Sequence, residues 1–140
     1  MASTLTTSTP TLAFGPEGNT GPFNFTEMDR LSEALTRSSH ETGINFSVLI
    51  GDLGPDRRGA VAAKHRTFGH EARDTCLVAV SPNEHAIEIG VGEHAARRID
   101  DRDCELAVAA MSSSFAGGDL IGGLVNALRM LADAAGNTAE

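Results

Sequence analysis

The sequence predicts an α/β protein, a three-layer α/β/α sandwich in which helices cover both faces of a small mixed sheet. Cys76-Leu-Val-Ala-Val80 is an unbroken apolar run, as expected of a strand buried on both faces. Residues 85–91 alternate instead, with Ile87, Ile89 and Val91 on one face. The turn residues 81–84 join the two strands, which must therefore pair as an antiparallel hairpin. Helical patterns on both sides of this hairpin supply the outer layers.

The composition and net charge of the chain argue against several classes of function. The chain has 140 residues, 41% of them hydrophobic, which suits a single globular domain. Its formal charge of -8 argues against nucleic-acid binding and against docking on anionic lipid. The start of the sequence has no secretory signal pattern, and no apolar stretch is long enough to span a bilayer. We therefore expect a cytoplasmic protein with no nucleic-acid partner and no direct membrane insertion.

Three ranges describe the expected domain organisation. Residues 1–22 are rich in Ser, Thr, Gly and Pro and predict a disordered N-terminal tail. Residues 23–136 form a single α/β domain. Residues 137–140 are polar and predict a frayed C-terminus.

The first helix and strand lead to the first candidate residue. Thr26 with Asp29 three positions later predicts a helix start, and Gly43 predicts its end. Residues 44–50 then alternate as a strand and run into the tight loop 51–55. Because ligands of open α/β sheets bind outside the carboxyl ends of strands, Asp52 is a candidate binding residue. The alternative is that Asp52 caps a turn.

The second helix is expected from Pro55 to about Phe68, with Gly69 as its stop. His65 and His70 near its end are five residues apart, whereas a metal-binding pair on a helix needs a spacing of four. This spacing disfavours a zinc site.

Two more helices follow the hairpin. A short helical turn is expected at 93–98, and Asp100 or Asp101 should cap the helix that ends at Gly117. Its core-facing stripe is Cys104, Val108, Met111 and Phe115. Asp119 should cap the last helix. Gly122 and Gly123 in its first turn predict that a packed neighbour or a ligand approaches the backbone closely.

Reactive side chains give no catalytic residue. Cys76 and Cys104 lack a Cys-x-x-Cys pattern and are interpreted as small core residues. Ser112–Ser114 lie on the last turn of a helix without a nucleophile elbow, which disfavours a serine hydrolase. The catalytic residues are therefore unknown.

The order of the elements resembles the TPM domain family, over roughly residues 25–131. The similar motifs are the strand that follows Thr-Gly at 42–43, the Phe68-Gly69 element with the second strand, and Ile87-Glu-Ile-Gly-Val-Gly92 as the third strand. The helix start Ile99-Asp-Asp101 and the stretch Phe115-Ala-Gly-Gly-Asp-Leu-Ile-Gly-Gly123 complete them. The small build is most similar to an actinobacterial branch of unknown function.

The resemblance implies calcium binding or acid phosphatase activity, with acidic residues at the strand ends. Asp74, Asp101 and Asp119 match acidic positions of the motifs, and Asp52 is added because it follows the first strand. Oxygen ligands of this kind suit Ca²⁺ or Mg²⁺, and no organic cofactor is expected.

Two departures from the TPM pattern bear on activity. The family's arginine in the hairpin turn, a phosphate clamp, is replaced by Asn83-Glu84-His85, and the second Gly of Val-Gly-x-Gly is His94. Arg97 or Arg98 could supply another clamp. The sequence thus favours a non-catalytic module that binds a divalent ion or a protein partner, for which a membrane protein is one option. The alternative is a metal-assisted acid phosphatase, in which a metal-bound water attacks.

Overall fold

The computed structural model describes residues 12–14 and 24–136. The strands and helices along these residues are β1 (Leu12–Phe14), α1 (Phe25–Thr42), β2 (Asn45–Ile50), α2 (Arg57–Arg66), the 3₁₀ helix η1 (Gly69–Asp74), β3 (Thr75–Ser81), β4 (Ala86–Val91), the 3₁₀ helix η2 (Ala95–Arg97), α3 (Asp101–Ala116) and α4 (Leu120–Ala135). Strands and helices alternate as far as β3, which is followed by β4 and then by helices alone.

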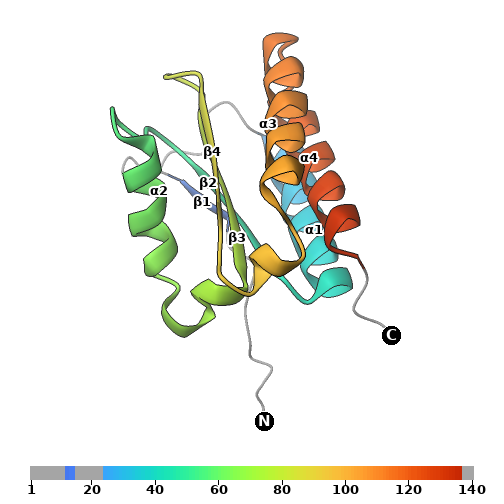
Figure 1. The fold of residues 1–140 in the computed structure, drawn as a ribbon. Helices are drawn as coiled ribbons and strands as arrows, with labels where there is room; N and C mark the ends of the chain where they lie inside the picture. The colour runs from blue at the N-terminus through green and yellow to red at the C-terminus, as the bar shows by residue number, and fades with distance from the viewer. Residues whose placement is uncertain (1–11, 15–23, 137–140) are drawn as a thin grey trace.

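The predicted three-layer architecture is confirmed. The sheet has the order β1-β2-β3-β4; β1, β2 and β3 run parallel and β4 is antiparallel to β3. Helix α2 covers one face of the sheet, and α1, α3 and α4 pack on the other (Figure 1). No described helix has the length and the apolar character needed to cross a membrane.

The two faces of the sheet have separate cores because β3 is buried on both sides. Cys76, Val78 and Val80 join the larger core, whose helical members include Leu31, Leu124 and Leu128. Leu77 and Ala79 point the other way, into the smaller core around Val61 of α2. All seven residues of β3 are buried, as its unbroken apolar run predicts.

Strand β4 is less well covered than β3. Ile87, Ile89 and Val91 face the helical layer but are only partly buried, because α3 makes few contacts with β4 and packs mainly on α4. The same arrangement leaves Cys104, Val108 and Phe115 of α3 partly buried, whereas Met111 is buried. The apolar faces predicted for β4 and α3 are correct, but α3 does not cover β4 completely.

The expectation of a disordered tail over residues 1–22 is wrong at β1. Residues Leu12–Phe14 pair in parallel with Val48–Ile50 of β2 and extend the sheet by one strand. A strand this short is held by backbone hydrogen bonds and cannot show a side-chain period, so the sequence pattern missed it. The rest of the predicted tail, and the predicted frayed end at 137–140, lie outside the described residues.

The predicted start of the first helix is also displaced. The N-cap is Asn24, whose side chain accepts a hydrogen bond from the N–H of Glu27 at 2.8 Å, and Glu27 accepts one from the N–H of Asn24 at 3.1 Å. Thr26 and Asp29 therefore lie inside the helix. Asparagine is a strong N-cap, and glutamate is the residue of a capping box that reaches back, which explains why this pair is used.

A packed neighbour accounts for Gly123. A Cβ added at Gly123 would lie 2.8 Å from the Cβ of Ser114 and 2.9 Å from Cε1 of Phe115, both on the last turn of α3. Gly122 is restricted by the side chain of Asp119, which caps the same helix. The close approach predicted here is therefore the packing of α4 on α3 at Gly123, and the capping side chain at Gly122.

Candidate functional site

Asp52 lies just past the carboxyl end of β2, as expected, but it is bonded to the β3–β4 turn. Its Oδ1 accepts a hydrogen bond from Nδ2 of Asn83 at 3.3 Å and a long one from Oγ of Ser81 at 3.5 Å. The carboxylate is exposed. Asp52 therefore links two loops at one end of the sheet and does not cap a turn of its own.

Asp74 lies at the opposite end of the sheet, immediately before β3. Its Oδ1 is 3.2 Å from Nδ1 of His94, the residue that replaces the second glycine of the TPM motif. Both side chains are partly exposed, so this ion pair, which needs a protonated imidazole, is an ordinary surface interaction.

Asp101 is exposed in the first turn of α3, and its neighbour Asp100 is the N-cap. Asp100 accepts a hydrogen bond from the N–H of Asp103 at 2.9 Å, and Asp103 accepts one from the N–H of Asp100 at 3.0 Å. The hydrogen bond from the Asp103 N–H lowers the pKa of Asp100. The first of the two predicted caps is therefore correct.

Asp119 is the N-cap of α4, as predicted. Its Oδ1 accepts a hydrogen bond from the N–H of Gly122 at 2.9 Å. A carboxylate in this position satisfies an unpaired backbone donor of the first helical turn. This structural role already uses one of the oxygens that a metal ion would need.

The four carboxylates predicted as ligands do not come together. Asp52 and the residues beside Asp119 lie at the end of the sheet that carries the β3–β4 turn, whereas Asp74 and Asp101 lie toward its other end. The 16 residues of α3 separate Asp101 from Asp119, a length of about 24 Å. Within the described residues, no group of three or more His, Cys, Asp or Glu side chains is placed to hold a metal ion. The donor set does not fit one Ca²⁺ or Mg²⁺ site.

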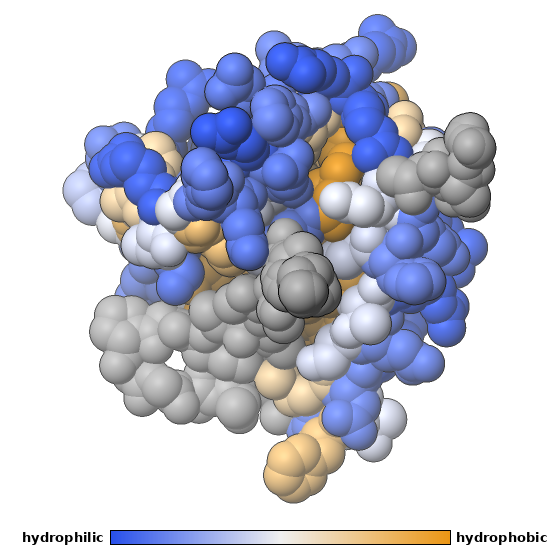
Figure 2. All heavy atoms as spheres, turned by 90° about the horizontal axis from the view of Figure 1, so that it is seen from below, coloured by the Kyte–Doolittle hydropathy of each residue, from blue (hydrophilic) through white to orange (hydrophobic). Residues whose placement is uncertain are grey.

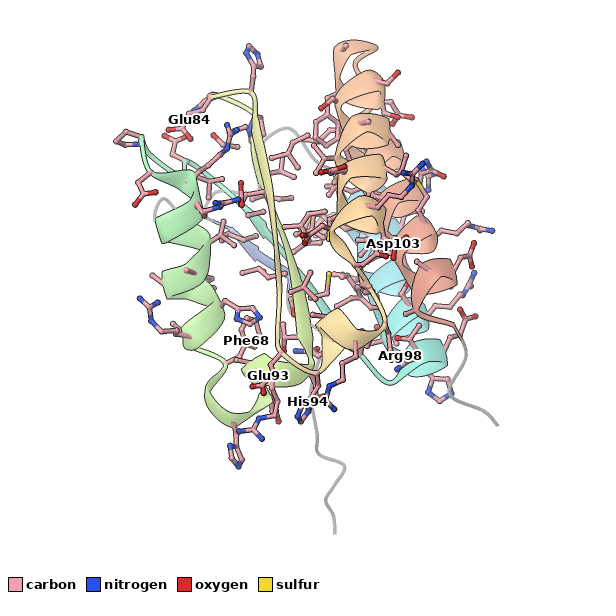
Figure 3. The ribbon with its side chains drawn as sticks, in the orientation of Figure 1. Phe68, Glu84, Glu93, His94, Arg98 and Asp103 are labelled. Atoms are coloured by element: carbon pink, nitrogen blue, oxygen red, sulfur yellow. The ribbon has the colours of Figure 1, made fainter. Side chains whose placement is uncertain are left out.

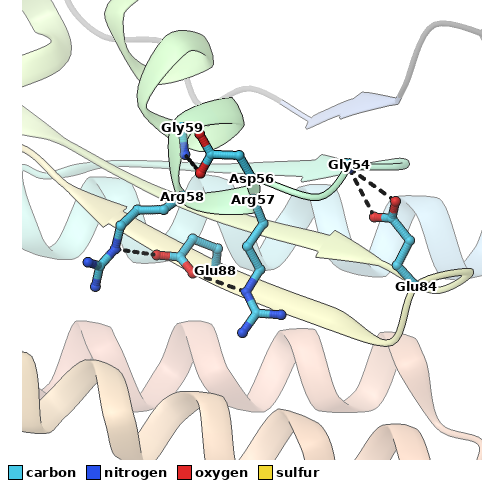
Figure 4. A network of polar contacts seen from close by, with 7 residues as sticks. All are labelled: Gly54, Asp56, Arg57, Arg58, Gly59, Glu84 and Glu88. Atoms are coloured by element: carbon cyan, nitrogen blue, oxygen red, sulfur yellow. Dashed lines mark hydrogen bonds and ion pairs between the residues drawn. The ribbon is translucent and has the colours of Figure 1, made fainter.

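Glu84 makes a contact between two loops that sequence reasoning missed. In the β3–β4 turn, its Oε1 accepts the N–H of Leu53 at 2.8 Å. Its Oε2 accepts the N–H of Gly54 at 3.0 Å (Figure 4). The N–H of Leu53, followed by the hydroxyl of Ser81, lowers the pKa of Glu84. An acidic residue in a turn opposite a glycine-containing loop is the signal that could have indicated this contact.

Glu88 forms a second polar cluster, on the α2 face of β4. Its carboxylate lies 3.5 Å from Nε of Arg57 and 3.7 Å from Nε of Arg58, so two guanidinium groups share one carboxylate (Figure 4). The Glu88 side chain is 22% exposed, while that of Arg58 is 90% exposed. Two of the basic side chains of α2 are therefore engaged with the sheet.

Arg98 is not a free phosphate clamp. Its guanidinium group donates to the carbonyl oxygens of Thr42 and Gly136 at 2.7 Å each, and Nε donates to Ala135 at 3.2 Å. These carbonyls end α1 and α4, and Arg98 lies beside them at the lower end of the molecule, far from Glu84 (Figure 3). Arg98 thus joins two helix ends that the hydrogen bonds of the helices leave unsatisfied.

Both cysteines are free thiols. Cys76 is fully buried, and burial raises the pKa of its thiol far above the ordinary value. Cys104 is partly buried, and burial together with the negative charge of Asp101 and Asp103 raises its pKa to about 11. Since the thiolate is the reactive form, the interpretation of these cysteines as packing residues is supported.

Two grooves flank β4 on opposite faces of the sheet. The first, of about 560 Å³, lies between β4 and α3 and is lined by Ile89, Val91, Cys104 and Val108, with Asp101 and Glu105 at its border. The second, of about 370 Å³, lies between β4 and α2 and is lined by Val61, His65 and Arg66. Seen from the lower end in Figure 2, the described surface is mostly hydrophilic. Apolar atoms show between polar side chains and in one group that projects at the edge of the view (Figure 2).

Comparison with known proteins now places the chain in a family. The model of a family described as Domain of unknown function (DUF5130) matches residues 5–132. The chain belongs to this family. The DUF5130 chain is also 37% identical over 113 residues to the uncharacterized protein MT2543 of Mycobacterium tuberculosis strain CDC 1551 / Oshkosh and, with the same figures, to Rv2468c of strain H37Rv. The alignment covers 79% of this chain but 65% of these relatives, so the chain spans less than two thirds of their length.

Solved structures share the fold of this DUF5130 domain. The N-terminal domain of cg2496 from Corynebacterium glutamicum has a TM-score of 0.71 at 12% identity, covering 100% of this chain and 89% of that one. The BA42 protein from Bizionia argentinensis has a TM-score of 0.70 at 15% identity, covering 83% of each chain. The N-terminal domain of a P. gingivalis protein gives 0.68 at 13% identity, covering 88% of this chain and 80% of that one. These identities show a common fold and nothing about activity.

Proposed function

We propose that this DUF5130 domain is a TPM-like, non-catalytic module that binds a protein partner on the apolar surface between β4 and α3. The observation that carries the proposal is the incomplete cover of β4. Ile87, Ile89 and Val91 form an apolar row that α3 leaves partly exposed, and the groove beside it has a volume of about 560 Å³. An apolar strip bordered by charged residues is the usual composition of a protein–protein contact.

The arrangement of the polar residues supports catalysis less well than it supports partner binding. A metal-assisted phosphatase needs metal ligands, a water position and a phosphate clamp within one site. Here Asp52 and Asp119 are separated from Asp74 and Asp101 by the length of the domain, and Arg98 is bonded to backbone carbonyls. Divalent-ion binding by this domain is poorly supported for the same reason, since it would use the same four carboxylates.

A paired assay tests the proposal. The purified full chain is incubated with p-nitrophenyl phosphate, at acidic and neutral pH, with and without millimolar Ca²⁺ or Mg²⁺. We expect no turnover above a buffer control. Metal-dependent phosphate release that is lost in Asp101→Asn or Asp74→Asn would contradict the proposal.

Binding is tested with surface variants of the same chain. Immobilised wild-type protein and two variants are exposed to an extract of the native host, and the bound proteins are quantified. Val108→Lys places a charge in the groove, whereas Asn126→Lys places one on the exposed side of α4. We expect the same partner on wild type and Asn126→Lys, and its loss on Val108→Lys. Equal capture by all three proteins would place the partner elsewhere on the domain.

A further inference from the structure

Strand β4 is an edge strand among the described residues, because its one strand neighbour is β3. The N–H of Gly92 donates to the carbonyl of Thr75 at 2.9 Å, which fixes the hydrogen-bonded positions of this antiparallel pair. Such positions alternate along the strand, so Gly90, Glu88 and Ala86 also bond to β3. It follows that Ile87, Ile89 and Val91 direct their backbone N–H and C=O groups away from β3, toward the open edge.

The open edge has few of the features that block strand pairing. Edge strands are usually protected by proline, by lysine, by a bulge or by a covering element. Residues Ala86–Val91 contain no proline or lysine, and they pair with β3 in continuous register. The one charged residue of the strand, Glu88, is bound to Arg57 and Arg58 on the α2 face. Within the part of the chain that the structure describes, the edge is therefore free to bond with another extended chain.

Side-chain space exists on both faces of this edge. The side chains of an added strand would point alternately to the two faces of the sheet. One set would enter the groove between β4 and α3, and the other the groove between β4 and α2, with volumes of about 560 and 370 Å³. Strand addition of this kind takes affinity from the backbone and specificity from such alternating pockets.

The two grooves differ in charge. On the α2 side, one carboxylate, Glu88, faces Arg57 and Arg58, and Arg66 borders the same groove, which leaves a positive excess. On the α3 side, Asp101 and Glu105 line a groove whose floor is apolar. Arg58 and Glu88 reach this groove too, so its carboxylates still outnumber its one guanidinium group. A complementary strand would carry acidic side chains toward α2 and would carry basic or long aliphatic side chains toward α3.

We propose that the partner of this domain is an extended peptide segment that adds to the free edge of β4, with acidic side chains on its α2 face and basic or long aliphatic side chains on its α3 face. This inference rests on the proposed partner-binding function and specifies its mode and the chemistry of the partner. It requires the outward backbone groups of Ile87, Ile89 and Val91.

A second copy of the chain is a less suitable occupant. Antiparallel pairing of β4 with itself about a twofold axis perpendicular to the sheet would place equal faces side by side. Arg58 and Arg66 would then approach their own copies on one face, and Asp101 and Glu105 theirs on the other. Like charges placed together oppose such a dimer.

The test uses a defined peptide probe. A phage-displayed library of random peptides is selected against the full chain, and the enriched peptides are synthesised. We expect enriched sequences that alternate acidic residues with basic or long aliphatic residues. Titration into ¹⁵N-labelled protein should shift the amide signals of Ile87, Ile89 and Val91 in a saturable manner, since these N–H groups form the new hydrogen bonds.

Ile89→Pro is the sharpest variant, because proline removes an N–H that does not bond to β3. Ile89→Val is its matched control, as it keeps the N–H and a similar side chain. We expect at least tenfold weaker binding to Ile89→Pro and near wild-type binding to Ile89→Val. If Ile89→Pro does not fold, the exposed double variant Arg58→Glu, Arg66→Glu tests the charge pattern and should also weaken binding at least tenfold.

Three results would overturn the inference. The first is that no peptide is enriched. The second is that the enriched peptides bind Ile89→Pro and the arginine variant as tightly as wild type. The third is that the wild-type chain is a dimer in solution through β4. If a partner is captured but its binding is insensitive to Ile89→Pro, strand addition fails while the partner-binding function stands. Metal-dependent phosphatase turnover would instead remove the proposed function itself.

Discussion

The carboxylate of Glu84 accepts a hydrogen bond from the backbone N–H of Leu53 at 2.8 Å and so holds the loop after β2 against the turn between β3 and β4. These residues are 31 positions apart in the chain. The contact occupies the turn in which the TPM pattern has an arginine, so this position carries a negative charge that stabilises backbone and would repel phosphate. Glu84 therefore has a structural role: it holds these two loops together.

The first prediction concerns the pH dependence of this loop. The pKa of Glu84 is lowered from its ordinary value of 4.5, mainly by the N–H of Leu53. Its stabilising effect is therefore complete above pH 4.5 and is lost as the pH falls through the lowered pKa. The ¹⁵N–¹H signal of Leu53 should show this step in wild type and in Glu93→Gln, which is altered at the opposite end of the molecule. The step should be absent in Glu84→Gln. A step that persists in Glu84→Gln would show that another group titrates there.

The second prediction separates a cap from a metal ligand at Asp119. Because its Oδ1 accepts the N–H of Gly122, Asp119→Ala should lower the free energy of unfolding by about 1 kcal/mol. Asp119→Asn should leave stability nearly unchanged, since asparagine caps equally well. Urea denaturation followed by far-ultraviolet circular dichroism measures both, which is suitable because the chain has no Trp or Tyr. An equal loss in both variants would mean that the negative charge, and not the cap, is what matters.

The third prediction concerns Arg98. Its hydrogen bonds to Thr42, Ala135 and Gly136 satisfy the ends of two helices, so Arg98→Ala should cost about 2–3 kcal/mol of unfolding free energy. Arg98→Lys should recover little of this, because an ammonium group cannot reproduce the planar fork of donors. The exposed neighbour Arg97→Ala serves as the control and should stay within about 0.5 kcal/mol of wild type. Equal values for the Arg97 and Arg98 variants would contradict the assigned role.

The fourth prediction concerns the two thiols. With a pKa of about 11, Cys104 holds roughly one thousandth of its thiol as thiolate at about pH 8, and Cys76 is buried completely. Iodoacetamide should therefore modify Cys104 slowly in the folded chain and leave Cys76 unmodified, as measured by mass spectrometry. Both should react quickly in urea. Rapid modification of folded Cys104 would reveal an activated thiol that the structure does not explain.

Local patterns were sufficient for most of the fold. The apolar run of β3, the alternation of β4 and the caps at Asp100 and Asp119 each depend on residues close in sequence, and each is confirmed. Strand β1 was missed because it is held by backbone pairing with β2, and three residues are too few to show the alternating side-chain pattern of a strand. The start of α1 was displaced because two plausible caps lie within a few residues of each other.

The candidate site was harder to predict because it depends on which chain ends meet. Acidic residues after strands and before helices suggested one cluster, but the antiparallel β4 and the up-and-down order of α3 and α4 distribute them over two ends. The contact of Glu84 with Leu53 joins two loops, and the hydrogen bonds of Arg98 join two helix ends. Such long-range contacts follow from the assembled fold and cannot be derived from spacing.

Site-specific photo-crosslinking in cells can show whether a partner binds beside β4. A photoreactive amino acid is placed at Glu105, which borders the groove between β4 and α3, and in separate chains at Asn126 on α4 and at Asp52. We expect a discrete crosslinked partner from position 105 and none from positions 126 or 52. A partner that crosslinks from position 52 or 126, and not from 105, would contradict the assignment of binding to the uncovered side of β4.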